Sequence, residues 1–239
     1  MMKKFILVLL IAIGTVAQAQ AQSIITGAWK LMDGKNEHHL FFQDGFFFHT
    51  QHNGNQFLMT RGGYFKINGD KINVLVLFNS ADTSEVNKKE AIPFSIDQNL
   101  LSLNLGKENT KFERVDDGKA PLAGVWQISG RMGDDGKLAD IHQTGTRQTY
   151  KMLTGKKFQW VAIDPAKKQF MGTGGGTYSF KDGKYTENIE FFSRDNTRVG
   201  ASLTFDGKLE DGKWHHSGLS SKGAKIYEVW SKVKVSPIF

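Results

Sequence analysis

Residues 62–72 read GGYFKINGDKI and residues 175–185 read GGTYSFKDGKY, so one pattern occurs twice in this chain. Each copy opens with two glycines, alternates aromatic or apolar residues with polar ones, and reaches an Asn-Gly or Asp-Gly pair. Two further motifs flank it in the same order, GAWKL (27–31) with GVWQI (124–128) and KFERV (111–115) with IYEVW (226–230). An ordered internal repeat indicates two copies of one structural unit.

Each copy has the spacing of short strands joined by tight turns. Asp44-Gly45 lies between the strand-like stretches 39–43 and 46–51, and it is the strongest two-residue hairpin signal in the chain. We count about eight candidate strands per copy and no long crossover segment. Consecutive hairpins predict an all-β fold of two tandem antiparallel up-and-down barrels, because closing a meander removes its open edges.

The polar turn cluster DDGKAP at 116–121 separates the two copies. We therefore predict a first barrel domain over residues 24–116 and a second over residues 121–235. The second copy carries an extra stretch, residues 131–147, that is rich in Gly, Asp and Thr.

The N-terminus has the pattern of an export signal. Two lysines precede an apolar run over residues 5–13, and small-x-small cleavage patterns follow at 17–19 and 19–21. We predict a signal peptide over residues 1–21 and a periplasmic or secreted mature protein. The apolar run is too short to span a membrane, and no later segment approaches the required length.

The composition excludes several kinds of site. With 0 cysteines, the chain has no disulfide, no thiol catalyst and no cysteine-ligated zinc or iron–sulfur site. Its formal charge of +7 comes from lysines spread through turn-like regions, as on an ordinary solvated surface. An anionic partner stays possible on this charge, whereas export argues against a nucleic acid.

The repeated Gly-x-Trp motif, followed by a strand meander and a basic residue on the last strand, resembles the lipocalin-like (calycin) proteins. Within that group the chain is similar to the uncharacterised lipocalin-like domains of exported bacterial proteins. The resemblance implies that the first-strand tryptophan closes one end of each barrel, under a last-strand cation. Trp29 would then pair with Arg114, and Trp126 with Lys232; such a contact contributes about 0.5–2 kcal/mol.

No motif for catalysis, cofactor binding or metal binding passes a close test. The glycine run at 172–177 leads into a strand and not into the helix that a dinucleotide site needs. Neighbouring histidines on a strand point to opposite faces, which separates His38 from His39. With a two-residue turn at Asp44-Gly45, Leu40 lies opposite His49, and His38 shares a face diagonally with His49. No carboxylate falls between these two, so we assign no metal, no cofactor and no catalytic residue.

The hairpin over residues 40–48 has aromatic side chains on both faces. Phe42 and Phe47 share one face, and Phe41, Phe46 and Phe48 share the other. Two interpretations stay open. One face packs inside the first barrel and the other against the second domain, or one face is an exposed platform for a ligand.

The second copy offers the better candidate for a ligand cavity. Its strand faces place together aromatic residues and one carboxylate, and we predict ligand-binding roles for Phe158, Trp160, Tyr178, Phe180, Tyr185 and Glu187. We expect Tyr185, Glu187, Ile189 and Phe191 to share the inward face. The other register, with Glu190 inward beside Phe192, stays open.

These observations favour a binding protein over an enzyme. We expect the second barrel to hold a small apolar or amphipathic molecule, with residues 131–147 as a lid whose Arg131, Lys137 and Arg147 would favour an anionic head group. Two alternatives stay open. One is a small-molecule hydrolase, lyase or isomerase that uses Glu187 or Glu190, and the other is a structural or partner-binding module of an extracellular assembly.

Overall fold

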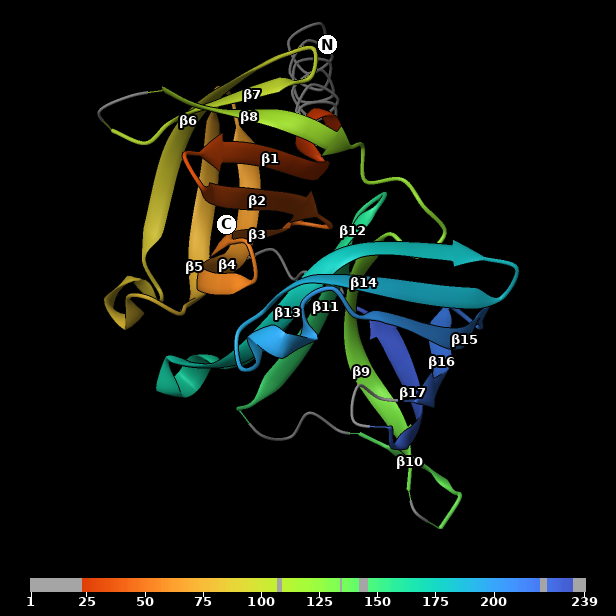
Figure 1. The fold of residues 1–239 in the computed structure, drawn as a ribbon. Helices are drawn as coiled ribbons and strands as arrows, with labels where there is room; N and C mark the ends of the chain where they lie inside the picture. Colours follow the sequence, from red (N-terminus) through yellow and green to blue (C-terminus); the bar gives the residue numbers. More distant parts are fainter. Residues whose placement is uncertain (1–22, 107–108, 134, 142–145, 220–222, 234–239) are drawn as a thin grey trace, which may run out of the picture.

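The computed structural model describes residues 23–106, 109–133, 135–141, 146–219 and 223–233. Its strands form two closed eight-stranded antiparallel barrels in tandem (Figure 1). The predicted fold class is confirmed. The predicted signal peptide lies outside the described residues, and no helix in the described part of the chain is long and apolar enough to cross a membrane.

The first barrel is an uninterrupted meander in which the first and last strands also pair. Its elements are β1 (Gly27–Asp33), β2 (Asn36–Gln43), β3 (Phe46–Asn53), β4 (Gln56–Asn68), β5 (Lys71–Asn79), the short 3₁₀ helix η1 (Thr83–Glu85), β6 (Lys89–Asp97), β7 (Leu100–Asn104) and β8 (Asn109–Asp116).

The second barrel repeats this plan, and its closure comes from the pairing of β9 with β17. The short strand β10 pairs only with the outer end of β9, so the extra stretch of the second copy begins as a hairpin arm. Residues 142–145 of that stretch lie outside the described part. The elements are β9 (Gly124–Met132), β10 (Leu138–Asp140), β11 (Gln148–Leu153), β12 (Lys157–Asp164), η2 (Pro165–Lys167), β13 (Gln169–Lys181), β14 (Lys184–Phe192), η3 (Asn196–Arg198), β15 (Ser202–Glu210), β16 (Lys213–Leu219) and β17 (Lys225–Lys232).

A tryptophan on the first strand of each barrel is buried beside a cation of the last strand, as the resemblance implied. The indole nitrogen of Trp29 donates to the Ile25 carbonyl at 2.8 Å, and that of Trp126 donates to the Leu122 carbonyl at 2.9 Å. The Arg114 guanidinium lies 4.0 Å from the Trp29 ring centroid. On the second barrel, the Lys232 ammonium lies 5.3 Å from the Trp126 ring. Each ring therefore has its apolar face buried and its N–H bonded.

The two repeated glycine pairs are explained by strand bulges. The register shifts between Gly62 and Gly63 in β4, and between Gly175 and Gly176 in β13. A Cβ at Gly63 would lie 2.0 Å from the Leu75 carbonyl oxygen, and one at Gly176 would lie 2.0 Å from that of Asn188. Only glycine fits so close to a neighbouring strand, so the repeat marks the point where each barrel bends.

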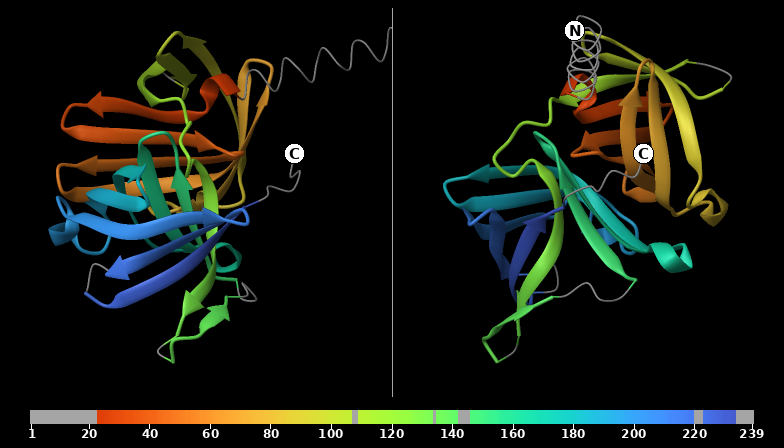
Figure 2. Two further views of the ribbon diagram at one scale, coloured as in Figure 1. Left: turned by 90° about the vertical axis from the view of Figure 1, so that its right-hand side faces the viewer. Right: turned by 180° about the vertical axis from the view of Figure 1, so that it is seen from behind.

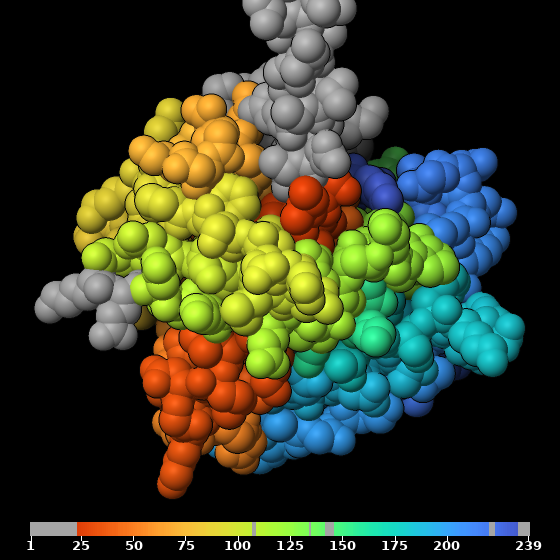
Figure 3. Space-filling model, turned by 90° about the horizontal axis from the view of Figure 1, so that it is seen from above, coloured from red at the N-terminus to blue at the C-terminus, as the bar shows by residue number. Residues whose placement is uncertain are grey.

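The two barrels share an apolar core. The outward side chains of the β2–β3 hairpin (Phe41, Phe46, Phe48) pack with residues of β9, β11 and β12, among them Val125, Met152 and Val161. The inward ones, Phe42 and Phe47, belong to the core of the first barrel. Both faces of the hairpin are therefore buried, which confirms the inter-domain interpretation. Figures 2 and 3 show the two barrels in contact side by side.

Buried polar groups also cross this interface. Gln159 of β12 is fully buried. Its amide oxygen accepts from Thr50 Oγ1 at 2.8 Å, and its nitrogen donates to Thr60 Oγ1 at 2.9 Å. At the linker, the Asp116 carboxylate accepts from the backbone of Gly155 and Lys156, each at 2.9 Å. These directional bonds fix how one barrel sits on the other.

Replacing Trp126 with alanine should lower the free energy of unfolding by about 3–5 kcal/mol, as other large core truncations do. The fully buried ring would leave a cavity, and the Leu122 carbonyl would lose its donor. Urea denaturation measures this loss. Trp160→Ala is the matched control, because Trp160 is only partly buried, and it should cost clearly less. A loss below about 1 kcal/mol for Trp126→Ala would contradict the structural role of this ring.

Candidate functional site

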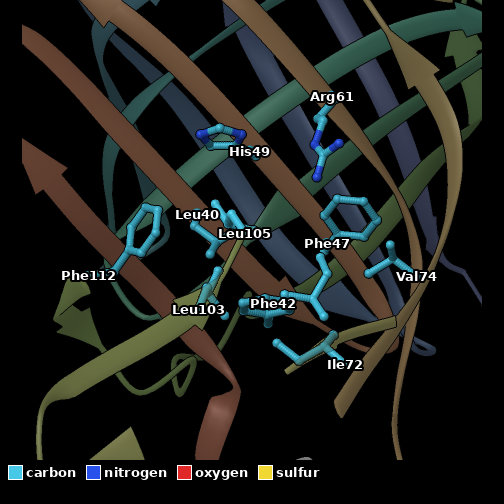
Figure 4. Close-up of a pocket in the computed structure, with 11 residues that line it drawn as sticks. Leu40, Phe42, Phe47, His49, Arg61, Ile72, Val74, Leu103, Leu105 and Phe112 are labelled. Atoms are coloured by element: carbon cyan, nitrogen blue, oxygen red, sulfur yellow. The ribbon is translucent and has the colours of Figure 1, made fainter. Parts of the chain in front are cut away.

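The interiors of the two barrels differ. In the first barrel, apolar side chains that include Leu40, Phe42 and Phe112 leave a cavity of only about 40 Å³. Figure 4 shows these side chains converging on a narrow space, with His49 and Arg61 at one end. The second barrel contains a cavity of about 390 Å³. A small molecule therefore has room in the second barrel and almost none in the first.

The lining of the larger cavity combines apolar and charged side chains. The apolar lining consists of Trp160, Ile189, Phe192, Ala201, Leu203, Phe205 and Ile226. The polar lining consists of Arg131, Lys151, Glu187, Arg198, His216 and Glu228. They come from every strand of the closed barrel except β13, from the η3 turn, and from Ala201 after that turn.

An ion pair is buried in the lining of this cavity. The ammonium of Lys151 bonds to Glu187, and both residues are less than a tenth exposed. Four aromatic rings surround that ammonium at 5.2–5.6 Å from their centroids: Phe158, Tyr185, Trp214 and Trp230. The ring faces and the carboxylate together replace the water that this cation has lost.

Tyr185 holds the carboxylate of this pair. Its hydroxyl donates to Glu187 Oε1 at 2.8 Å. Burial raises the pKa of Tyr185 well above its ordinary value, and the negative charge of Glu187 raises it further. The phenol therefore stays protonated and remains a hydrogen-bond donor to Glu187.

A second charged group lies nearer the mouth. Glu228 accepts from Arg131 at 2.5 Å and from the indole nitrogen of Trp230 at 3.2 Å. His216 Nδ1 lies 3.8 Å from the same carboxylate, too far for a hydrogen bond. In the described part of the chain, this buried nitrogen has no hydrogen-bond partner. Burial lowers the pKa of His216 to about 2, with the charges of Lys151 and Arg131 adding to the effect. His216 is thus a neutral ring with one unsatisfied nitrogen in the cavity wall.

Of the residues predicted to bind a ligand, Trp160 and Glu187 line the cavity. The remaining four belong to the packed core of the same barrel: Phe158, Tyr178, Phe180 and Tyr185. Within it, Tyr178 donates to the Thr154 carbonyl at 2.7 Å. These four side chains support the cavity wall from behind.

The predicted inward face of β14 is right only as far as Ile189. The bulge opposite Gly175 and Gly176 shifts the register, so Phe192 turns into the barrel and Phe191 turns toward the first barrel. Glu187 is the inward carboxylate, whereas Glu190 bonds to Lys157 at 2.5 Å near the interface. The expectation that Phe191 shares the face of Glu187 is therefore wrong, because an extra residue occupies the strand between them.

Sequence reasoning missed Lys151, His216 and Glu228. Lys151 interrupts the otherwise apolar or aromatic run 150–153, and Glu228 lies among apolar and aromatic residues on β17. A charged residue inside a buried strand was the available signal. Arg131 was expected to favour an anionic head group, and it does line the cavity; Lys137 and Arg147 are exposed and are not among the lining residues.

Comparison with known proteins identifies no activity. Residues 121–238, essentially the second barrel with its linker, match the model of a family described as a domain of unknown function (DUF4488). A crystal structure of an uncharacterized protein from Bacteroides eggerthii DSM 20697 is similar at 16% identity and a TM-score of 0.33, over 46% of this chain and 98% of that one. No match is found among the curated proteins.

The neutral His216 predicts a specific pH dependence of stability. Its pKa of about 2 in the folded protein lies below the value of about 6.5 expected when the chain is unfolded. Between these values the unfolded state binds one more proton, so stability is complete above pH 6.5 and falls as the pH decreases. The slope from this one group is up to about 1.4 kcal/mol per pH unit.

Urea denaturation at several pH values between 6.5 and 4.5 measures this slope. His216→Gln should flatten it, whatever the variant does to stability at pH 7. If the unfolding free energy of the wild type and of the variant has the same slope against pH, His216 has the same pKa in the folded and the unfolded state. That result would contradict the burial of His216 in the folded protein.

Proposed function

We propose that this protein is an exported, lipocalin-like binding protein that holds a small amphipathic molecule in its second barrel. The observation that carries the proposal is the cavity of about 390 Å³, whose lining combines apolar and charged side chains. This volume falls within the range of about 300–1,000 Å³ that is usual for small-molecule sites. A module that served only as a structural part would gain nothing from such a cavity.

The lining indicates which groups a ligand carries. Trp160, Phe192 and Leu203 offer apolar contacts for a chain or ring system. Arg131 and the Nδ1 of His216, which has no hydrogen-bond partner among the described residues, offer contacts for a polar head group. Because Arg131 is more than half exposed and lies at the mouth, a head group with a negative charge can share its guanidinium with Glu228.

The arrangement of Glu187 favours binding over acid–base catalysis. Its carboxylate is already engaged by Lys151 and by the hydroxyl of Tyr185. A general base must instead be free to reach a proton of the substrate. In this proposal the pair fixes the polarity of the inner wall, and no bond of the ligand is broken.

Ligand binding should change the fluorescence of Trp160, which lies in the cavity wall. We expect saturable titrations with fatty acids and weaker ones with the matching alcohols, because the alcohols lack the charge that Arg131 would contact. Ala201→Phe fills the cavity and should abolish the response. Ala139→Phe, on the exposed strand β10, is the matched control and should bind as the wild type does.

Two outcomes would count against this proposal. If fatty acids, sterol-like compounds and aromatic acids all fail to give a saturable response, the structural-module alternative takes its place. If a bound compound is chemically changed, and if Glu187→Gln stops the change, the chain is an enzyme.

Export should leave a processed N-terminus. We expect the mature chain, recovered from the periplasm or the medium of a bacterial host, to begin at Gln20 or Gln22. Intact-mass measurement decides between these two ends. A full-length chain found only in the cytoplasm would contradict export.

A further inference from the structure

Three side chains of the first barrel converge on the side that faces the second barrel. Glu37 and His39 come from β2, and His52 comes from β3. His39 Nε2 lies 2.9 Å from Glu37 Oε1 and 3.2 Å from His52 Nε2. The three candidate ligand atoms all lie within 4.8 Å of one another.

The strand register explains this convergence. Glu37 lies directly opposite His52, and His39 shares their outward face two residues along β2. The imidazole rings of His39 and His52 are stacked, with centroids 5.3 Å apart. Phe191 of the second barrel packs on His52 at 5.6 Å. Packing from the second barrel therefore holds both rings in place.

Hydrogen bonding already prepares one histidine as a ligand. His52 Nδ1 lies 3.0 Å from the Gly54 carbonyl oxygen, which can only accept, so the neutral ring carries its proton on Nδ1. Its Nε2 then has a free lone pair that points at His39. A backbone carbonyl on the far nitrogen is the usual partner of a histidine that binds metal through the near one.

A neutral His39 can carry its proton on either ring nitrogen, and each choice leaves its buried Nδ1 without a partner among the described residues. If the proton is on Nε2, the buried Nδ1 is left as an acceptor with no donor among the described residues. If the proton is on Nδ1, three lone pairs from Glu37, His39 and His52 meet with nothing between them. The second arrangement is the one in which a cation bound by all three atoms would be stabilised.

From this geometry we infer that Glu37, His39 and His52 bind a divalent zinc ion through one carboxylate oxygen and two Nε2 atoms. Zinc bonds of about 2.0–2.2 Å place tetrahedral ligands about 3.3 Å apart, close to the two separations that the cluster already has. Water takes the fourth position. The Glu37 carboxylate supplies the oxygen ligand, a kind of ligand that zinc accepts beside two imidazoles.

An ion can reach this site from solvent. Both histidines are buried, but the side chain of Glu37 is 21% exposed and that of the neighbouring Glu190 is 31% exposed. Lys30 lies 2.8 Å from the carboxylate oxygen that would bind the ion. Its side chain is 39% exposed, so it can swing away into water when zinc binds.

The test uses the untagged chain and zinc alone, with calorimetric titration. We expect one ion per chain, at least about tenfold weaker binding in Glu37→Gln and in His52→Gln, and tighter binding in Lys30→Met. His38→Gln is the matched control. His38 stacks on His49 and lies on the opposite face of β2 from the cluster, so its loss should leave the affinity unchanged.

Glu37→Gln keeps the test valid if His52→Gln fails to fold, because Glu37 is partly exposed and circular dichroism can verify the fold of its variant. Cobalt titration adds a second measurement: a visible absorption of a four-coordinate site should appear in the wild type and be lost in Glu37→Gln. The inference is overturned if no zinc binds with a stoichiometry of one, or if Glu37→Gln and His52→Gln bind as tightly as the wild type.

Discussion

The burial of both faces of the β2–β3 hairpin is the constraint on which the rest of the structure depends. A strand of an isolated barrel needs only one apolar face, but here Phe41, Phe46 and Phe48 need a second cover. The side of the second barrel formed by β9, β11 and β12 supplies it. Burial of these aromatic rings stabilises the joined barrels by roughly 1.5–3 kcal/mol for each ring. The two copies therefore form one unit, whose polar bonds at Gln159 and Asp116 set its geometry.

Within that unit the two copies share a backbone plan and differ in what fills them. Both have the buried tryptophan under a cation and the glycine pair at a bulge. The interior of the first barrel is packed with Phe, Leu, Ile and Val side chains, and packing of this kind stabilises the fold. The second interior holds Lys151, Glu187 and Glu228, whose desolvation a purely structural barrel would avoid. Conversely, the first copy carries the histidine and glutamate cluster on its outer face. The differences between the copies mark the two candidate sites.

Much of the fold could be predicted from the sequence because its signals are local. The Asp44-Gly45 turn, the repeated Gly-x-Trp motif and the alternation along the hairpin each depend on a few neighbouring residues. The two-residue turn also predicts the register between the two strands of the hairpin, and Leu40 lies opposite His49 as expected.

The sites were harder to predict because they depend on contacts between distant segments. Lys151 meets Glu187 across 36 residues of chain, and Arg131 meets Glu228 across 97. Because of the bulge in β14, Phe191 faces the interface between the barrels and not the cavity. The bulge depends on how β14 pairs with β13, which the sequence of β14 alone does not show. His39 was separated correctly from His38, but neither His52 nor Glu37 was recognised as lying on the face of His39.

The claim that the barrels form one unit is tested most directly by scanning calorimetry of the full mature chain. A shared core predicts one transition, with equal calorimetric and van't Hoff enthalpies. Two transitions, of which Trp126→Ala shifts one and leaves the other in place, would contradict the account and make the barrels independent domains.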